Sequence, residues 1–141
     1  MTQAQIPQIL SQHLNTLSLE RNVAAFDDSL TPNIDISGDY NTEAIDTSKW
    51  EVTVDLRVEM SYKNGLALSI KLQYVATIDA TDVSDADLDI FLYLEYPPML
   101  LLELRKVVAD TTMAAGVHQV MLDPWDLSRQ FAAELEGNKN G

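Results

Sequence analysis

The chain has 141 residues, no cysteine and 46% hydrophobic residues. This length fits one domain with a sizeable core, and the hydrophobic share excludes wholesale disorder. The absence of cysteine excludes disulfides, thiol catalysis and thiolate metal sites. The formal net charge is −13, and residues 1–96 hold 16 acidic but 5 basic residues. Such a surface repels nucleic acid and anionic lipid; it suits a basic protein partner, or it serves solubility alone.

The N-terminus has neither the basic start nor the apolar run of a secretory signal. No eighteen apolar residues follow one another, so we expect no membrane insertion. The expected location is the cytoplasm.

The first third of the chain is the least regular. Residues 6–20 favour an edge strand in their second half, although their first half could begin a helix. Residues 21–33 have the composition of a loop, and residues 34–40 predict a short strand.

Two strands with one buried face are predicted over residues 50–61 and 66–78, because apolar and polar residues alternate in both. The connection is Lys63-Asn64-Gly65. A two-residue loop would turn the two apolar faces to opposite sides of the sheet. A three-residue loop, closed by Gly65 in a left-handed bulge, puts both apolar faces on one side. We therefore predict the three-residue loop.

An acidic crossover with some helix should follow. It contains Asp85-x-Asp87-x-Asp89, which is similar to the start of a calcium loop. That loop requires glycine at its sixth position and glutamate at its twelfth, where this chain has Ile90 and Tyr96. A solvated acidic face is the better interpretation.

Residues 97–135 predict two helices. The first follows Pro97-Pro98 and ends at Gly116, which can adopt a left-handed conformation. The second begins at Asp123-Pro124, an N-cap followed by proline at the first helical position.

The predicted fold class is therefore α+β, with a four-stranded antiparallel sheet followed by two C-terminal helices. Residues 1–135 should form a single domain and residues 136–141 a flexible tail. One sheet face needs cover and the helices are short for that task. Oligomerisation is a natural outcome.

No catalytic centre is recognisable in the sequence. His13 and His118 lack any ligand spacing, no glycine-rich phosphate loop is present, and no serine lies in a nucleophile elbow. We expect no enzyme activity, no cofactor and no metal.

Six apolar or aromatic residues fall outside the clearly alternating strands, and two interpretations of them stay open. They either plug the ends of the core or line a hydrophobic groove for extended polypeptide. These candidate groove residues are Phe26, Leu30, Tyr40, Phe91, Tyr93 and Tyr96.

Several segments resemble the SecB family of bacterial export chaperones. Residues 97–106 are similar to the family's segment CPNILFPYARE, and residues 119–127 resemble its PQLNLAPVNFD. Phe26-x-x-x-Leu30-x-Pro32 is similar to FQKDWQP. The resemblance covers about residues 17–135, and it implies a dimer of dimers with the main helices between the sheets.

Departures from the family pattern affect the partner surface. Two acidic positions that the family uses to contact the SecA motor fall at Lys71 and Thr16, while Glu20 matches a third. Leu30 replaces the family's loop tryptophan. The resemblance therefore implies the chaperone fold more strongly than docking to a SecA-like motor, for which Glu20 is the candidate contact.

The function that the resemblance implies is ATP-independent holding of unfolded or nascent polypeptide in a hydrophobic groove, which keeps it competent for export. One alternative is a chaperone dedicated to one partner, such as an antitoxin. Another is a carrier of a small apolar ligand.

Overall fold

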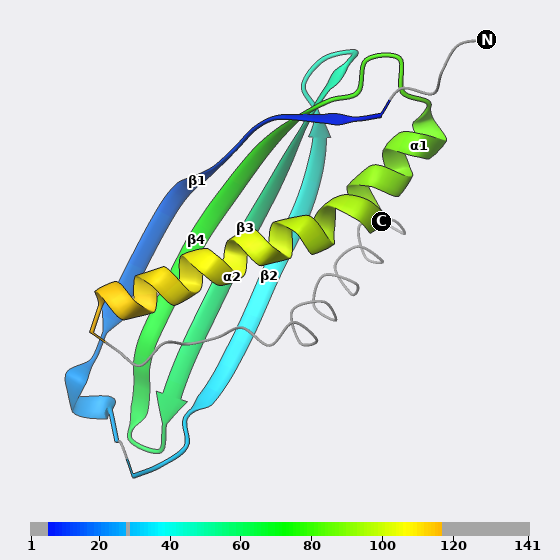
Figure 1. The fold of residues 1–141 in the computed structure, drawn as a ribbon. Helices are drawn as coiled ribbons and strands as arrows, with labels where there is room; N and C mark the ends of the chain where they lie inside the picture. The colour runs from blue at the N-terminus through cyan, green and yellow to red at the C-terminus, as the bar shows by residue number, and fades with distance from the viewer. Residues whose placement is uncertain (1–5, 28, 117–141) are drawn as a thin grey trace.

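The computed structural model describes residues 6–27 and 29–116. Its four strands are β1 (Gln8–Arg21), β2 (Asn33–Ala44), β3 (Lys49–Tyr62) and β4 (Gly65–Asp79). They form one antiparallel sheet in the order β1-β4-β3-β2 (Figure 1). The predicted sheet is confirmed. The predicted helix after Asp123 and the predicted tail lie outside the described residues.

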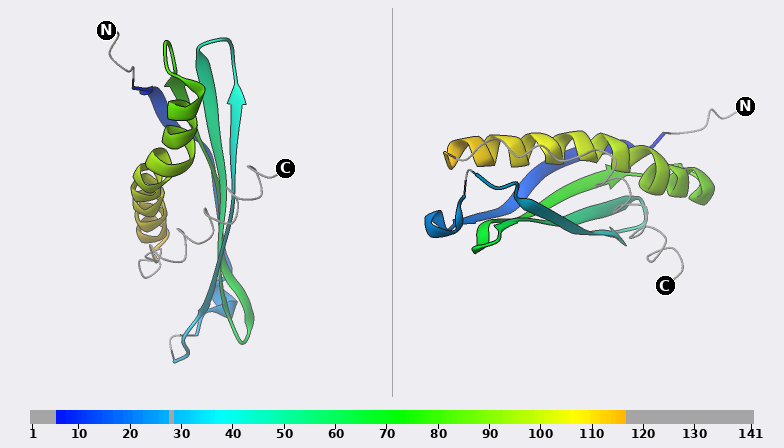
Figure 2. Two further views of the ribbon diagram at one scale, coloured as in Figure 1. Left: turned by 90° about the vertical axis from the view of Figure 1, so that its right-hand side faces the viewer. Right: turned by 90° about the horizontal axis from the view of Figure 1, so that it is seen from below.

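The α-helical residues that the structure describes all lie over one face of the sheet (Figure 2). Even-numbered residues of β3 and β4 point to the covered, inner face and are buried from Val52 to Met60 and from Leu68 to Ile78. Odd-numbered residues of the same strands point to the outer face and are almost all polar. The alternation of apolar and polar residues in β3 and β4 thus corresponds to a sheet with one apolar face.

The register of the β3–β4 hairpin is the one predicted, but its turn is different. Val58 pairs with Ile70, as a three-residue loop would require. The chain instead turns in two residues, with Tyr62 paired to Gly65, and the register shifts between Met60 and Ser61. This β-bulge supplies the extra residue one step inside the hairpin. Gly65 has a φ of 125°, which favours glycine.

The pairing of β1 explains why apolar and polar residues do not alternate strictly along it. Two register shifts, after Ile9 and after Leu14, interrupt its pairing with β4. Each shift inserts a residue that changes which positions face inward, so Leu14, Leu17 and Leu19 share the inner face without strict alternation. Residues 8–21 form strand throughout, and the helical alternative for the first half is wrong.

The acidic crossover, predicted to contain some helix, is helical from Asp85 onward and continues into the helix predicted after Pro97-Pro98. The helical segment comprises α1 (Asp85–Ile90), the π-helical turn η2 (Phe91–Glu95) and α2 (Tyr96–Ala114). Ser84 caps α1 by accepting from the Asp87 N–H at 3.2 Å. Pro97 and Pro98 lack the N–H groups that an α-helix would need at that point. The wider π-turn, in which Tyr96 N–H donates to Phe91 O, lies directly before them.

Helix α2 crosses the inner face obliquely, from the end of β2 toward the end of β1 (Figure 1). Leu100, Leu104 and Val108 are buried against the sheet. The helix ends at Ala114, and the predicted glycine Gly116 follows its C-cap with a φ of 72° and an N–H that donates to Met113 O. In the part of the chain that the structure describes, no helix is long and apolar enough to cross a membrane.

Candidate functional site

The six candidate groove residues separate into two groups at opposite ends of the sheet. Tyr40, Phe91, Tyr93 and Tyr96 meet where η2 packs over β2. Phe26 packs on Tyr62 next to the β3–β4 hairpin, and Leu30 belongs to the segment between β1 and β2, which runs past the same end of the sheet (Figure 1). Each group has its own contacts and its own exposure.

The first group is bonded into the core. Tyr40 OH donates to the carbonyl oxygen of Leu92 at 2.6 Å, and Tyr96 OH donates to Gln12 Oε1 at 2.9 Å. The Phe91 and Tyr96 rings stack at 5.6 Å. Burial raises the pKa of both the Tyr40 and the Tyr96 phenols, so both stay protonated and neutral. These bonds hold the π-turn against β2 and β1.

Accessibility decides which members of this group can meet a bound chain. Tyr40 and Tyr96 are 0% exposed and Phe91 is 6% exposed, so in this structure their side chains serve packing. Tyr93 is half-buried, and its hydroxyl lies 3.0 Å from Thr42 Oγ1. Only Tyr93 of these four remains a candidate for direct contact with a polypeptide.

The second group forms an apolar surface at the other end of the sheet. We call it the end patch and define it as Val23, Phe26, Leu30, Ile34 and Tyr62. Phe26 and Tyr62 pack with ring centroids 6.0 Å apart. Val23, Leu30 and Ile34 are each more than 40% exposed. Exposed large apolar side chains on segments that meet at one end of a sheet are typical of a surface that binds another apolar group.

The end patch is held by bonds to the sheet and to the end of α2. Asn22 N–H donates to Ala67 O at 2.9 Å, and Ala25 is buried. The Arg21 guanidinium lies 5.4 Å from the centre of the Phe26 ring and donates to Ala115 O at 3.0 Å. One arginine therefore joins the patch to the helix.

Sequence reasoning missed Val23, Ile34, Tyr62 and Arg21. Ile34 was counted as part of the strand predicted over residues 34–40. It has the same parity as Tyr40 on β2 and faces inward opposite Met60. Tyr62 continues the inward series of β3. The contact of Arg21 with the helix end joins residues 94 positions apart, and nothing in the sequence indicates it.

Glu20 lies apart from both groups. It pairs with Ser69 on the outer face of β1 and is exposed. In the described ranges, no group of histidine and acidic residues could hold a metal ion.

Comparison with known proteins agrees with this geometry. Residues 1–138 match the family described as preprotein translocase subunit SecB. The chain is 26% identical over 129 residues to protein-export protein SecB of Erythrobacter litoralis, covering 90% of this chain and 72% of that protein. It is 27% identical over 139 residues to the protein of the same name in Maricaulis maris, covering 94% and 80%.

A solved structure shows the same fold. It is a Mycobacterium tuberculosis SecB-like chaperone in complex with a peptide from the HigA1 antitoxin, and it superposes with a TM-score of 0.72. The two sequences are 14% identical, and the match covers 84% of this chain and 89% of that one. From the family match and the shared fold together, this chain belongs to the SecB family.

Proposed function

We propose that this protein is an ATP-independent holding chaperone that binds unfolded or nascent polypeptide and keeps it competent for export. The single observation that supports this most is the end patch, an exposed apolar surface on the helix-covered side of a SecB-family sheet. Members of this family are chaperones rather than enzymes. Binding, and not catalysis, is therefore the activity to seek.

The binding energy would come from apolar side chains of the client. Burial of apolar surface contributes about 25 cal/mol per Å², and immobilising a flexible chain offsets much of that gain. Phe26 and Leu30 offer a rim without directional hydrogen-bond donors, and Tyr93 offers a second contact at the far end of the inner face. Many weak contacts of this kind would make the client's sequence matter little.

The proposed assembly is a dimer of dimers with the helices between the sheets. The outward side of the helical segment exposes Leu94 and Leu102, each by more than 60%, together with Met99. Arg105 Nε is buried and has no hydrogen-bond partner among the described residues. A second copy packed on α2 would bury the apolar residues and could supply an acceptor for Arg105.

The proposed partner for delivery is a SecA-like translocase motor in the cytoplasm. Glu20 supports this role because its carboxylate is exposed on the outer face, away from the client surface. Lys71 and Thr16 stand where the family has acidic contacts. A motor that docks on this face would therefore meet one acidic residue of the family pattern, Glu20 on β1, and a basic residue, Lys71, on β4.

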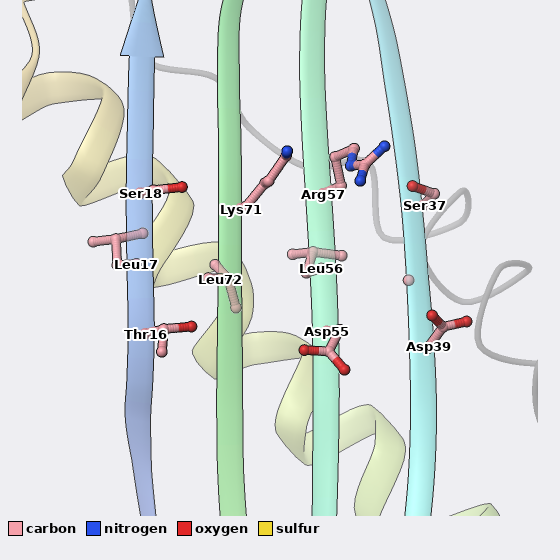
Figure 3. Close-up of a pocket in the computed structure, with 11 residues that line it drawn as sticks. Thr16, Leu17, Ser18, Ser37, Asp39, Asp55, Leu56, Arg57, Lys71 and Leu72 are labelled. Atoms are coloured by element: carbon pink, nitrogen blue, oxygen red, sulfur yellow. The ribbon is translucent and has the colours of Figure 1, made fainter.

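A second candidate function is a chaperone dedicated to one partner. The observation that favours it is the fold shared with a chaperone that was solved with an antitoxin peptide. A small-ligand carrier gains no comparable support: a hollow of about 560 Å³ among the described residues lies on the polar outer face (Figure 3). Breadth of client choice separates the general chaperone from the dedicated one.

The test is suppression of aggregation with three unrelated chemically unfolded proteins, measured by light scattering against the ratio of chaperone to client. A general holding chaperone suppresses all three without ATP. Suppression of one alone would establish dedication. Absence of suppression for every client would overturn the proposed function.

A further inference from the structure

The turn between β3 and β4 contains the pair Asn64-Gly65. Glycine has no Cβ, so its backbone nitrogen can approach the side-chain amide of the asparagine before it. The other asparagines among residues 6–27 and 29–116 are each followed by a β-branched residue, which crowds that approach. They are Asn15, Asn22, Asn33 and Asn41. Within the described ranges, Asn64 alone has an amide that its own main chain can attack without this crowding.

The surroundings of the pair leave room for such an attack. Both residues are exposed, and the Asn64 side chain has no hydrogen bond with any residue that the structure describes. Gly65 has a φ of 125°, and a Cβ placed on it would meet no atom within 4 Å. By contrast, Asn15 Nδ2 donates to Gln73 Oε1 at 2.6 Å. The Asn64 amide is thus free to rotate toward the Gly65 nitrogen.

We propose that Asn64 is a site of spontaneous deamidation in the folded protein. The Gly65 backbone nitrogen loses its proton to water and bonds to Asn64 Cγ. The bond from Cγ to the side-chain nitrogen then breaks, and that nitrogen takes up a proton and leaves as ammonia. Water opens the resulting cyclic imide at one of its two carbonyls, which gives either aspartate or isoaspartate. The net reaction consumes one water, releases one ammonia and oxidises nothing.

The two products differ in their effect on the β3–β4 hairpin. Both add a negative charge, but isoaspartate also routes the main chain through Cβ and Cγ and so inserts a methylene into it. The length of a hairpin turn determines how its strands pair. Tyr62 pairs with Gly65 and packs on Phe26, with ring centroids 6.0 Å apart. Isoaspartate at position 64 should therefore loosen the pairing of Tyr62 at the edge of the end patch.

The inference concerns a covalent change and the stability of one hairpin. It does not rest on the proposed function, because neither the release of ammonia nor the exchange of backbone amides requires a client. Failure of the chaperone assay would leave it intact, and failure of the deamidation assay would leave the proposed function intact.

The test incubates the folded, full-length protein at mildly alkaline pH and follows each asparagine by mass spectrometry. Cleavage after glutamate at acidic pH gives peptide 60–95, in which Asn64 is the only asparagine. The second Asn-Gly pair of the sequence, Asn140-Gly141, falls in a different peptide. Electron-transfer fragmentation separates aspartate from isoaspartate. The matched control is Asn41, which is also exposed but precedes Thr42.

We expect Asn64 to convert at least about tenfold faster than Asn41 and to give both products. Asn64→Gln should abolish the conversion in peptide 60–95 over the same period, because its ring would need an additional atom. Conversion of Asn64 no faster than that of Asn41 would overturn the proposal. Conversion that occurs in urea but not in the folded protein would overturn it as well.

Hydrogen exchange tests the effect on the hairpin. After incubation, the amides of residues 60–66 should exchange faster than in fresh protein, in proportion to the isoaspartate formed. Asn64→Asp is the control, because it carries the negative charge without the additional methylene. Exchange in the incubated protein equal to that in Asn64→Asp would overturn the effect assigned to isoaspartate.

Discussion

The same strands give the sheet two different faces, one apolar and buried and one polar and exposed. On the inner face, side chains from β3 and β4 are buried under α2 and supply the core. On the outer face, the residues between them are mostly polar or charged, and Arg57 lies opposite Lys71. The difference shows that stability resides on one side, which leaves the other side free to be shaped for a partner.

The strongest test of this difference is the same valine-to-alanine substitution on each face. Val54 is 0% exposed on the inner face, whereas Val75 on the adjacent strand points outward and is half-buried. Val54→Ala should lower the free energy of unfolding by about 2–3 kcal/mol, because two buried methyl groups are lost and a cavity remains. Val75→Ala should cost less than about 1 kcal/mol. Equal losses in urea titrations would contradict the assignment of the core to the inner face.

The bonds of the π-turn give the next largest effect. Tyr40→Phe removes the donor to the buried Leu92 carbonyl and should cost about 1–2 kcal/mol. Tyr93→Phe, whose hydroxyl lies in a half-buried contact with Thr42, should cost less. Hydrogen exchange of the amides in residues 91–96 should accelerate in the first variant. A stability loss without faster exchange there would place the effect elsewhere.

A smaller effect, of opposite sign, is expected on the outer face. Lys71→Gln should raise the free energy of unfolding by about 0.2–1 kcal/mol, because it relieves the repulsion with Arg57. The gain should shrink in high salt, where the repulsion is screened. A loss of stability in this variant would mean that Lys71 is paired within the fold.

The smallest effect concerns pH. Hydrogen bonds from the Thr81 hydroxyl and backbone N–H to Asp79 hold the pKa of this carboxyl below its ordinary value of 3.8. A lowered pKa in the folded state stabilises the protein above pH 3.8, and this stabilisation is lost as the pH falls through the lowered pKa. Asp79→Ala should therefore lower Tm slightly at pH 7 and progressively less below pH 3.8. A difference that does not change with pH would show that the charge is irrelevant.

Strand pairing was predictable because one buried face leaves one register for β3 and β4. The apolar parity of the two strands determined that Val58 lies opposite Ile70, although the position of the bulge did not follow from it. The two register shifts in β1 concealed its inner face, since a bulge changes the parity of every later residue. Some helix in the crossover was predicted, but its continuation into α2 was not, because prolines usually mark a boundary, whereas here a π-turn lies directly before them.

The candidate site was predictable only in part. Composition could not separate the buried Tyr40, Phe91 and Tyr96 from the accessible Phe26 and Leu30, because burial depends on where α2 crosses the sheet. The pairing of Arg57 with Lys71 depends on cross-strand register. It could have been found from the predicted hairpin alone, as Arg57 and Lys71 have the parity of the polar face.

The most direct test of the account is the affinity for an unfolded client when the end patch alone is changed. Leu30→Asp places a charge on an exposed side chain of the patch, and Ile45→Asp does the same to an exposed residue of the β2–β3 loop at the other end of the sheet. Phe26→Asp is a second patch variant, to be compared by circular dichroism and size-exclusion chromatography. Binding to a labelled unfolded protein should weaken at least about tenfold in both patch variants and stay unchanged in Ile45→Asp, with the same assembly in all. Unchanged binding in Leu30→Asp and Phe26→Asp would contradict the account.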